Sequence, residues 1–235
     1  MIYLYCLTDP GCEPPAELRG IAGERVRSVG STGRVAAWVS DLPEDPGPAT
    51  AELVRVHDRV VRAALALETP LPARFGQSFA GDAALTRALE PRVEAMERSL
   101  ERVRGAVEMT VRILLPGLPA AEAAEGREEI VPAAGAGRAY MARLRERRQA
   151  SAELRREAEF LQARVARAVD ELAREGVSSP VMPGAHSFSL SHLVAREAVS
   201  EYRLAVDSLV KGDPALRLLV SGPWAPYSFA RIASE

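Results

Sequence analysis

The longest helical pattern in this sequence covers residues 138–175 and limits what the chain can fold into. Its apolar residues recur every three or four positions, which is the spacing of one helix face, but polar Arg147 and Ser151 interrupt the stripe. A helix of about 38 residues would be about 57 Å long, at 1.5 Å per residue. That length exceeds the width of a small domain. Part of the helix must therefore project, bend or pair with another element.

Shorter patterns of both kinds surround this helix. We predict helices over 51–67, 82–104 and 196–210, with Thr50 and Asp82 as N-caps and a kink near Glu90, where Pro91 interrupts the second helix. Strands are expected over 2–7, 26–29, 35–39, 107–115, 186–194 and 216–220, the second and third forming a hairpin. Residues 177–184 read as a loop after a helix cap at Gly176. The segment 69–76, with two prolines and a terminal glycine, is expected to be an extended sheet edge.

This alternation predicts the α+β class, with two ferredoxin-like sandwich domains. The first would cover residues 1–115. Residues 116–137, rich in Ala, Gly, Pro and Glu, read as a flexible linker. The second domain would cover 138–235 and contain the long helix 138–175.

Composition excludes several classes of protein. The chain has 235 residues, 30 basic against 32 acidic, so its net charge of −2 argues against generic binding to nucleic acid or to anionic membranes. No stretch approaches the roughly 18 apolar residues of a membrane span. Two cysteines, Cys6 and Cys12, are too few for a disulfide framework, and the short apolar start lacks the basic leader of a signal peptide. We therefore expect a reduced, cytoplasmic protein.

A search for catalytic chemistry finds no constellation. The only histidines are His57, His186 and His192; the last two would share a strand face but lie about 20 Å apart, too far to bind one metal. Each is expected to be a half-buried or interfacial side chain. No glycine-rich phosphate loop, nucleophile elbow or zinc motif occurs. We predict no enzyme, no cofactor and no metal.

Two stiff, aromatic segments remain, Leu71–Gly76 and Gly222–Tyr227. Their prolines could fix turns that seal a core edge. They could equally preform a surface for a partner, because prolines reduce the entropy lost on binding. The residues alone leave these two readings open.

These segments carry a family resemblance. The chain resembles the gas vesicle protein F/L family (GvpF/GvpL) in four stretches that occur in the same order: Ile2–Tyr5; His57 with Leu71–Gly76; Gly105 with Glu108–Val111; and Gly222–Phe229. The closing stretch is the most specific, although Ala225 stands where the family usually has proline.

The resemblance implies a non-enzymatic accessory protein of gas vesicle formation with two α+β domains, located in the cytoplasm and at the gas vesicle. It implies binding to the small hydrophobic shell protein GvpA, whose free subunits expose surface that aggregates. We expect that binding surface around Trp38, Arg74 and Phe75, and expect the long helix to contact other accessory proteins. Gly76, Gly222, Pro223, Trp224, Pro226 and Tyr227 are expected to be structural motif residues.

Two alternatives stay open. The chain could be a minor structural component of the vesicle shell without chaperone-like action. It could also be a ligand-binding or catalytic ferredoxin-like domain, which would need a pocket such as one lined by His57, Glu68 and Arg74. If Trp224 seals the core, Trp224→Ala should cost about 3–5 kcal/mol; if Trp224 contacts a partner, the variant should fold and lose binding.

Overall fold

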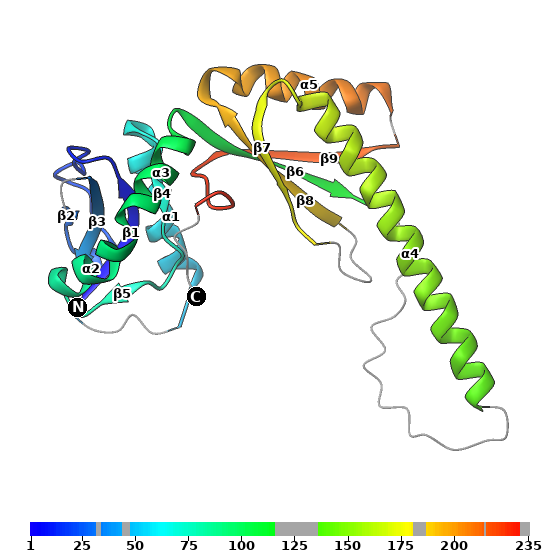
Figure 1. The fold of residues 1–235 in the computed structure, drawn as a ribbon, viewed down its shortest axis with the longest axis horizontal. Helices are drawn as coiled ribbons and strands as arrows, with labels where there is room; N and C mark the ends of the chain where they lie inside the picture. Colours follow the sequence, from blue (N-terminus) through cyan, green and yellow to red (C-terminus); the bar gives the residue numbers. More distant parts are fainter. Residues whose placement is uncertain (32–33, 44–47, 116–135, 181–186, 214, 231–235) are drawn as a thin grey trace. The chain divides into compact units, whose positions relative to one another are not determined.

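A computed structural model describes residues 1–31, 34–43, 48–115, 136–180, 187–213 and 215–230 (Figure 1). By its internal contacts the chain divides into two units. Unit 1 comprises 1–109, 193–199 and 222–235, and unit 2 comprises 110–192 and 200–221. This division differs from the one expected from sequence, because two segments beyond residue 192 pack with the N-terminal half. The expected linker, 116–137, lies outside the described residues except at its last two positions.

The sheet of unit 1 has the order β2-β3-β1-β4, with β5 also pairing with β1. Its strands are β1 Ile2–Thr8, β2 Val26–Ser31, β3 Val35–Asp41, β4 Leu71–Pro72 and β5 Ser78–Phe79. The pairing of β1 with β3 is antiparallel and shifts register between Leu4 and Cys6. The expected hairpin and N-terminal strand are therefore present, and β4 lies at the sheet edge as expected.

Helices cover both faces of this sheet. The helix α1, Ala51–Leu67, begins at the expected cap, where the Thr50 hydroxyl accepts a hydrogen bond from the Leu53 N–H at 3.2 Å. Its buried side chains pack with Tyr3, Tyr5 and Trp38. On the opposite face lie α2, Asp82–Leu89, and α3, Val93–Val103, packed against Leu4 and Val39. Unit 1 thus has three layers rather than the two of a simple sandwich.

The break between α2 and α3 falls at the expected position. A short 3₁₀ turn, η2, Glu90–Arg92, separates the helices at the proline. One detail differs, because Gly81 is the N-cap of α2 and Asp82 lies in its first turn. A second short 3₁₀ turn, η1, Ile21–Gly23, precedes β2.

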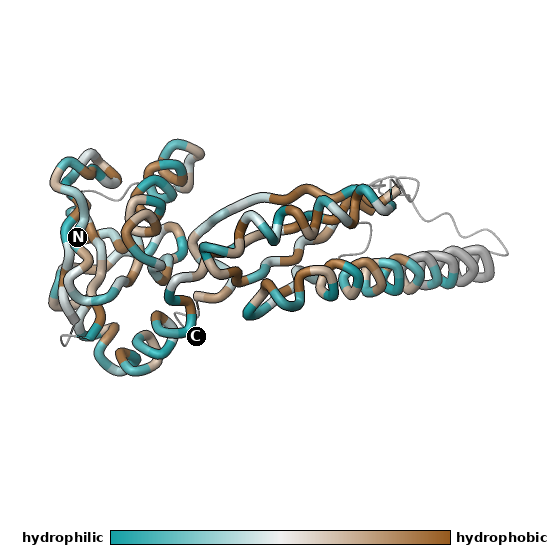
Figure 2. The backbone as a smooth tube through the Cα atoms, turned by 90° about the horizontal axis from the view of Figure 1, so that it is seen from above, coloured by the Kyte–Doolittle hydropathy of each residue, from teal (hydrophilic) through white to brown (hydrophobic). Residues whose placement is uncertain are grey.

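Unit 2 is built on a second sheet with the order β7-β8-β6-β9, whose strands are β6 Ala106–Leu114, β7 Ala173–Ser178, β8 Ser187–Ala195 and β9 Arg217–Trp224. Parts of β6, β8 and β9 belong to unit 1 by contacts. The helices of unit 2 are α4, Ala136–Val169, and α5, Val199–Gly212, which follows the 3₁₀ turn η3, Arg196–Ala198. Figure 2 shows apolar and polar stretches alternating along α5 and along the part of α4 that is not drawn in grey.

The long helix is shorter than predicted at its C-terminal end. It stops at Val169, and the chain enters the edge strand β7, which contains Gly176, the residue expected to cap the helix. Buried residues on α4 run from Leu154 through Leu161 to Val169. The ion pair between Arg164 and Asp213, at 2.8 Å, joins this part of α4 to the end of α5. The α+β class and the two-domain organisation with a long helix are confirmed.

Candidate functional site

Two of the motif stretches meet at a buried histidine in unit 1. His57 on α1 lies against Tyr3 of β1 and the segment that follows β4. The His57 Nε2 atom is 3.2 Å from the Ala73 carbonyl oxygen, and its Nδ1 atom is 3.1 Å from the Tyr3 hydroxyl. A carbonyl can only accept, so Nε2 carries the proton and Nδ1 accepts from Tyr3. The Gly76 N–H then donates to the Tyr3 oxygen at 2.9 Å.

This arrangement fastens the proline segment to α1 and β1. The Phe75 ring lies edge-on to His57, with ring centroids 5.9 Å apart. Burial lowers the pKa of His57, and burial raises the pKa of Tyr3 to about 12. Both groups are neutral near pH 7 and hold the chain in place. His57 is therefore more deeply buried than the half-buried or interfacial position expected from the sequence.

The surface expected around Trp38, Arg74 and Phe75 is only partly available. Trp38 has no exposed surface, and its Nε1–H donates to the Cys12 carbonyl at 2.8 Å. A partner cannot reach it in this structure, because the strand β3 is covered on both faces. Arg74 is exposed and Phe75 is half-buried. These two residues keep the expected surface as a proposal, and Trp38 is a core residue.

The closing motif packs beside α1. The Arg62 guanidinium lies 4.5 Å from the centre of the Trp224 ring, a cation–π contact on a half-buried tryptophan. Tyr227 is 40% exposed, and burial together with the nearby Asp58 carboxylate raises its pKa. Pro226 is buried and Pro223 is exposed. Trp224 is therefore neither a sealed core residue nor a free surface one.

Gly222 and Glu108 fix the course of this segment. Gly222 has φ +116, and a Cβ there would lie 2.7 Å from the Glu108 carbonyl oxygen. The buried Glu108 carboxylate accepts from the Ser228 N–H at 2.8 Å and from the Ser228 hydroxyl at 2.7 Å. The Arg102 guanidinium donates to the Phe229 carbonyl. Gly222 and Glu108 thus each have a structural role in the motif.

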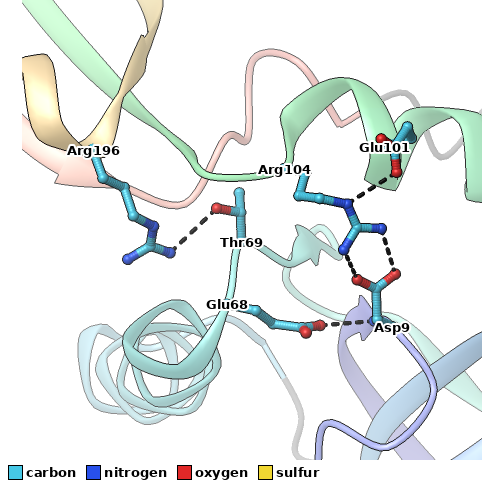
Figure 3. Close-up of polar contacts among 6 residues, drawn as sticks. All are labelled: Asp9, Glu68, Thr69, Glu101, Arg104 and Arg196. Carbon is cyan, nitrogen blue, oxygen red and sulfur yellow. Dashed lines mark hydrogen bonds and ion pairs between the residues drawn. The ribbon is translucent and has the colours of Figure 1, made fainter.

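A second polar cluster of unit 1, drawn in Figure 3, was not expected from the sequence. A cavity of about 220 Å³ opens between the end of α1 and the end of α3. It is lined by Asp9, Leu67, Glu68, Thr69, Leu100, Arg104, Gly105 and Arg196. The residues of this cluster that contact one another are up to 127 residues apart in the sequence, so no local sequence pattern could have predicted the cluster.

Charges in this cluster are partly paired. The Glu68 carboxylate accepts from the Asp9 N–H at 2.7 Å, and Arg104 pairs with the carboxylates of Asp9 and Glu101. Burial raises the pKa of Glu68, and burial followed by the Glu68 charge raises that of Cys12 to about 12. The pocket considered in the sequence analysis, lined by His57, Glu68 and Arg74, is not formed. Glu68 lies on this cavity, His57 is enclosed in its own hydrogen-bond network, and Arg74 is exposed.

The potential metal ligands of the described residues lie apart from one another. None of their His, Cys, Asp and Glu side chains gather in threes at metal-binding distance. His192 is buried rather than half-buried, with its Nδ1 2.7 Å from the Tyr202 hydroxyl. His186 lies outside the described residues. Among the described residues, no helix is both long and apolar enough to cross a membrane.

Comparison with known proteins places the chain in a family. A family profile described as gas vesicle synthesis protein GvpL/GvpF matches residues 1–231. The chain belongs to the GvpL/GvpF family. It is 34% identical to gas vesicle protein L of Streptomyces sp., covering 99% of this chain and 94% of that one. It is 33% identical to gas vesicle protein F of the same organism, over 84% of each.

Solved structures agree with the fold. The crystal structure of GvpF from Anabaena sp. superposes with a TM-score of 0.76 at 24% identity, covering 99% of this chain and 97% of that one. GvpF from Microcystis aeruginosa gives a TM-score of 0.73 at 20% identity, covering 98% and 99%. At these identities the likeness establishes the fold. The family assignment rests on the profile and the curated relatives, and it gives the chain a part in gas vesicle formation.

Proposed function

We propose that this GvpL/GvpF protein binds the hydrophobic shell protein GvpA, prevents its aggregation and assists assembly of the gas vesicle. One observation supports this above others. The two stiff motif segments present exposed or half-buried aromatic and arginine side chains beside the same helix. Phe75 contacts His57 of α1, and Trp224 stacks under Arg62 of α1. Aromatic and arginine side chains are the ones most enriched at protein interfaces.

We name this surface the α1 rim and define it as Arg62, Arg74, Phe75, Trp224 and Tyr227. Its backbone is fixed before any partner arrives, through the histidine network on one side and Glu108 on the other. Such preorganisation lowers the entropy cost of binding. An apolar shell subunit would cover the rings, and the arginines would contact carbonyl or carboxylate groups at their margin.

The test is co-expression with GvpA, followed by a soluble-fraction assay and pull-down. The wild-type chain should keep GvpA soluble and co-purify with it. The double variant Arg74→Glu/Tyr227→Ser changes exposed rim side chains and should lose most of this binding while staying folded. Arg87→Glu, which reverses an exposed charge on α2 across the sheet, is the matched control and should bind like wild type.

Two outcomes would count against the proposal. If GvpA aggregates equally with and without the wild-type chain, the chaperone-like role is wrong, and the chain should be sought in washed vesicles as a minor structural component. If both variants bind like wild type, GvpA binds elsewhere and the α1 rim is not the site. The long helix α4 as a contact for other accessory proteins stays a proposal, to be tested by the same pull-down with those proteins.

A further inference from the structure

Arg196 is held in place by two stretches of unit 1, the end of α1 with the following Thr69 and the turn at Gly105. Its N–H donates to the Gly105 carbonyl at 3.0 Å. Its Nη2 donates to the Leu65 carbonyl at 2.7 Å and to the Thr69 hydroxyl at 3.2 Å, and that hydroxyl in turn donates to the Ala106 carbonyl at 2.8 Å. The guanidinium is thus oriented by neutral acceptors, and it lines the cavity described above. Figure 3 shows its contact with Thr69.

The charge of this arginine is not neutralised within the part of the chain that the structure describes. Arg104, on the same cavity, pairs with two carboxylates, whereas no described carboxylate pairs with Arg196. A guanidinium has five N–H donors, so the Nε and Nη1 donors of Arg196 have no described acceptor. Burial lowers the pKa of Arg196, as expected for a partly desolvated cation without a counter-charge.

The rest of the cavity wall narrows the choice of anion. Asp9 is paired with Arg104, but Glu68 has no ion pair among the described residues, and its negative charge would repel a phosphate dianion more strongly than a singly charged group. Leu67, which also lines the cavity, is 57% exposed. A small anion on an apolar stem fits both features, with its charge at Arg196 and its stem on Leu67.

We propose that this cavity binds a carboxylate of a partner polypeptide, with Arg196 as its donor. The carboxylate comes either from an acidic side chain or from a chain terminus. This site is separate from the α1 rim and does not depend on GvpA binding. It goes beyond the proposed function by adding an anchor point for an acidic group.

Solution NMR of the full chain tests the proposal directly. Two probes separate the sources: N-acetylglutamate α-amide has only a side-chain carboxylate, and N-acetyl-leucine has only a terminal one. N-acetylglutamine amide and N-acetyl-leucinamide are their neutral counterparts. At least one acidic probe should shift the Arg196 Nε–H and Gly105 amide signals saturably at constant ionic strength, and the neutral ones should not. Inorganic phosphate should bind more weakly.

Variants link the signal to the residue. Arg196→Gln should weaken binding of the acidic probe about tenfold or more, since a charge-assisted hydrogen bond is lost. Arg87→Gln, an exposed arginine on α2, is the control and should not change it. Glu68→Gln should strengthen binding of the acidic probe, because it removes a negative charge from the cavity wall. If Arg196→Gln fails to fold, this variant still tests the site in the same titration.

Three results would overturn the carboxylate site. The acidic probes could cause no more shift than their neutral counterparts in the wild-type chain. Folded Arg196→Gln could bind as well as wild type. Phosphate could bind more tightly than either probe, which would mean that a different anion occupies the cavity.

Discussion

At the scale of single residues, the closing motif depends most on a glycine. Gly222 combines a left-handed φ of +116 with contacts that leave no space for a side chain, since a Cβ would lie 2.7 Å from the Glu108 carbonyl oxygen and 2.9 Å from the Met109 sulfur. The methionine could move, but the backbone oxygen cannot move without shifting β6. Both strain and overlap therefore oppose any other residue.

We predict that Gly222→Ala destabilises the protein by about 1–3 kcal/mol from backbone strain, with a similar amount from overlap. The urea midpoint measures this. Gly30→Ala is the control, because nothing lies within 4 Å of its added Cβ and its φ is not left-handed, so its midpoint should stay near wild type. Equal midpoints for the two variants would contradict the crowding at Gly222.

His57 makes stability depend on pH. Burial lowers its pKa in the folded state below the unfolded value of 6.5. The unfolded chain therefore binds a proton that the folded chain does not, and stability falls as pH drops below about 7 toward the folded pKa. Glu68, whose folded pKa is raised, acts in the opposite direction at lower pH.

The measurement is the free energy of unfolding between pH 7.5 and 5.5. His57→Gln keeps hydrogen-bonding groups without titrating, so its stability should fall less over this range than that of the wild type. His192→Gln should behave in the same way, because burial also lowers the pKa of His192. Parallel curves for the wild type and both variants would show that neither histidine is linked to folding.

At the scale of elements, the buried Glu108 carboxylate of β6 holds the part of the closing segment that follows β9. Glu108→Gln should place an amide N–H₂ or a single oxygen opposite two Ser228 donors, so one donor loses its acceptor. The expected cost is about 1–3 kcal/mol. Amide hydrogen exchange should rise at Ser228–Ala230 while staying unchanged in β2, which makes β2 the internal control. Unchanged exchange at these three residues would mean that the segment is held by other contacts.

Helices and strands were predictable where the residues that determine them lie within one short stretch of sequence. The helix α1 was predicted with its bounds and its Thr50 cap, because apolar spacing and the cap both lie within a short stretch. The strand β7 was missed, since Ala173–Ser178 is an exposed edge strand without an apolar alternation, and the helical spacing of the preceding residues continues to Leu172. The helix end at Val169 could not be read for the same reason.

Sites were less predictable than elements. An all-apolar strand such as Val35–Val39 is buried on both faces, but only the position of α1 shows that Trp38 has no exposed side. Asp9 and Arg104 are 95 residues apart and Thr69 and Arg196 are 127 apart, so their meeting depends on the complete topology. The motif residues point to the α1 rim, which stays a proposal, and of them only Gly105 lines the cavity.

At the scale of the whole molecule, the chain is not divided at a single boundary. Leu193 and Phe229, both buried, belong to the apolar cluster of unit 1 with Leu4 and Met96, and Ala225 belongs to the cluster beneath α1. Residues 193–199 and 222–230 thus complete a core that begins at residue 2. A fragment that ends at 115 would expose this surface to water.

We predict that residues 1–115 alone do not form a stable domain, although the sequence suggested a domain with these bounds. The loss of Phe229 alone should cost about 3–5 kcal/mol, comparable to much of the stability of a domain. The fragment should bind a hydrophobic dye and show poor NMR dispersion. As the control, fusing residues 222–235 to it through a flexible linker should restore part of the dispersion, because these residues supply both Phe229 and the Ser228 contact to Glu108. A well-dispersed spectrum and a cooperative transition for 1–115 alone would show instead that the returning segments are dispensable for unit 1.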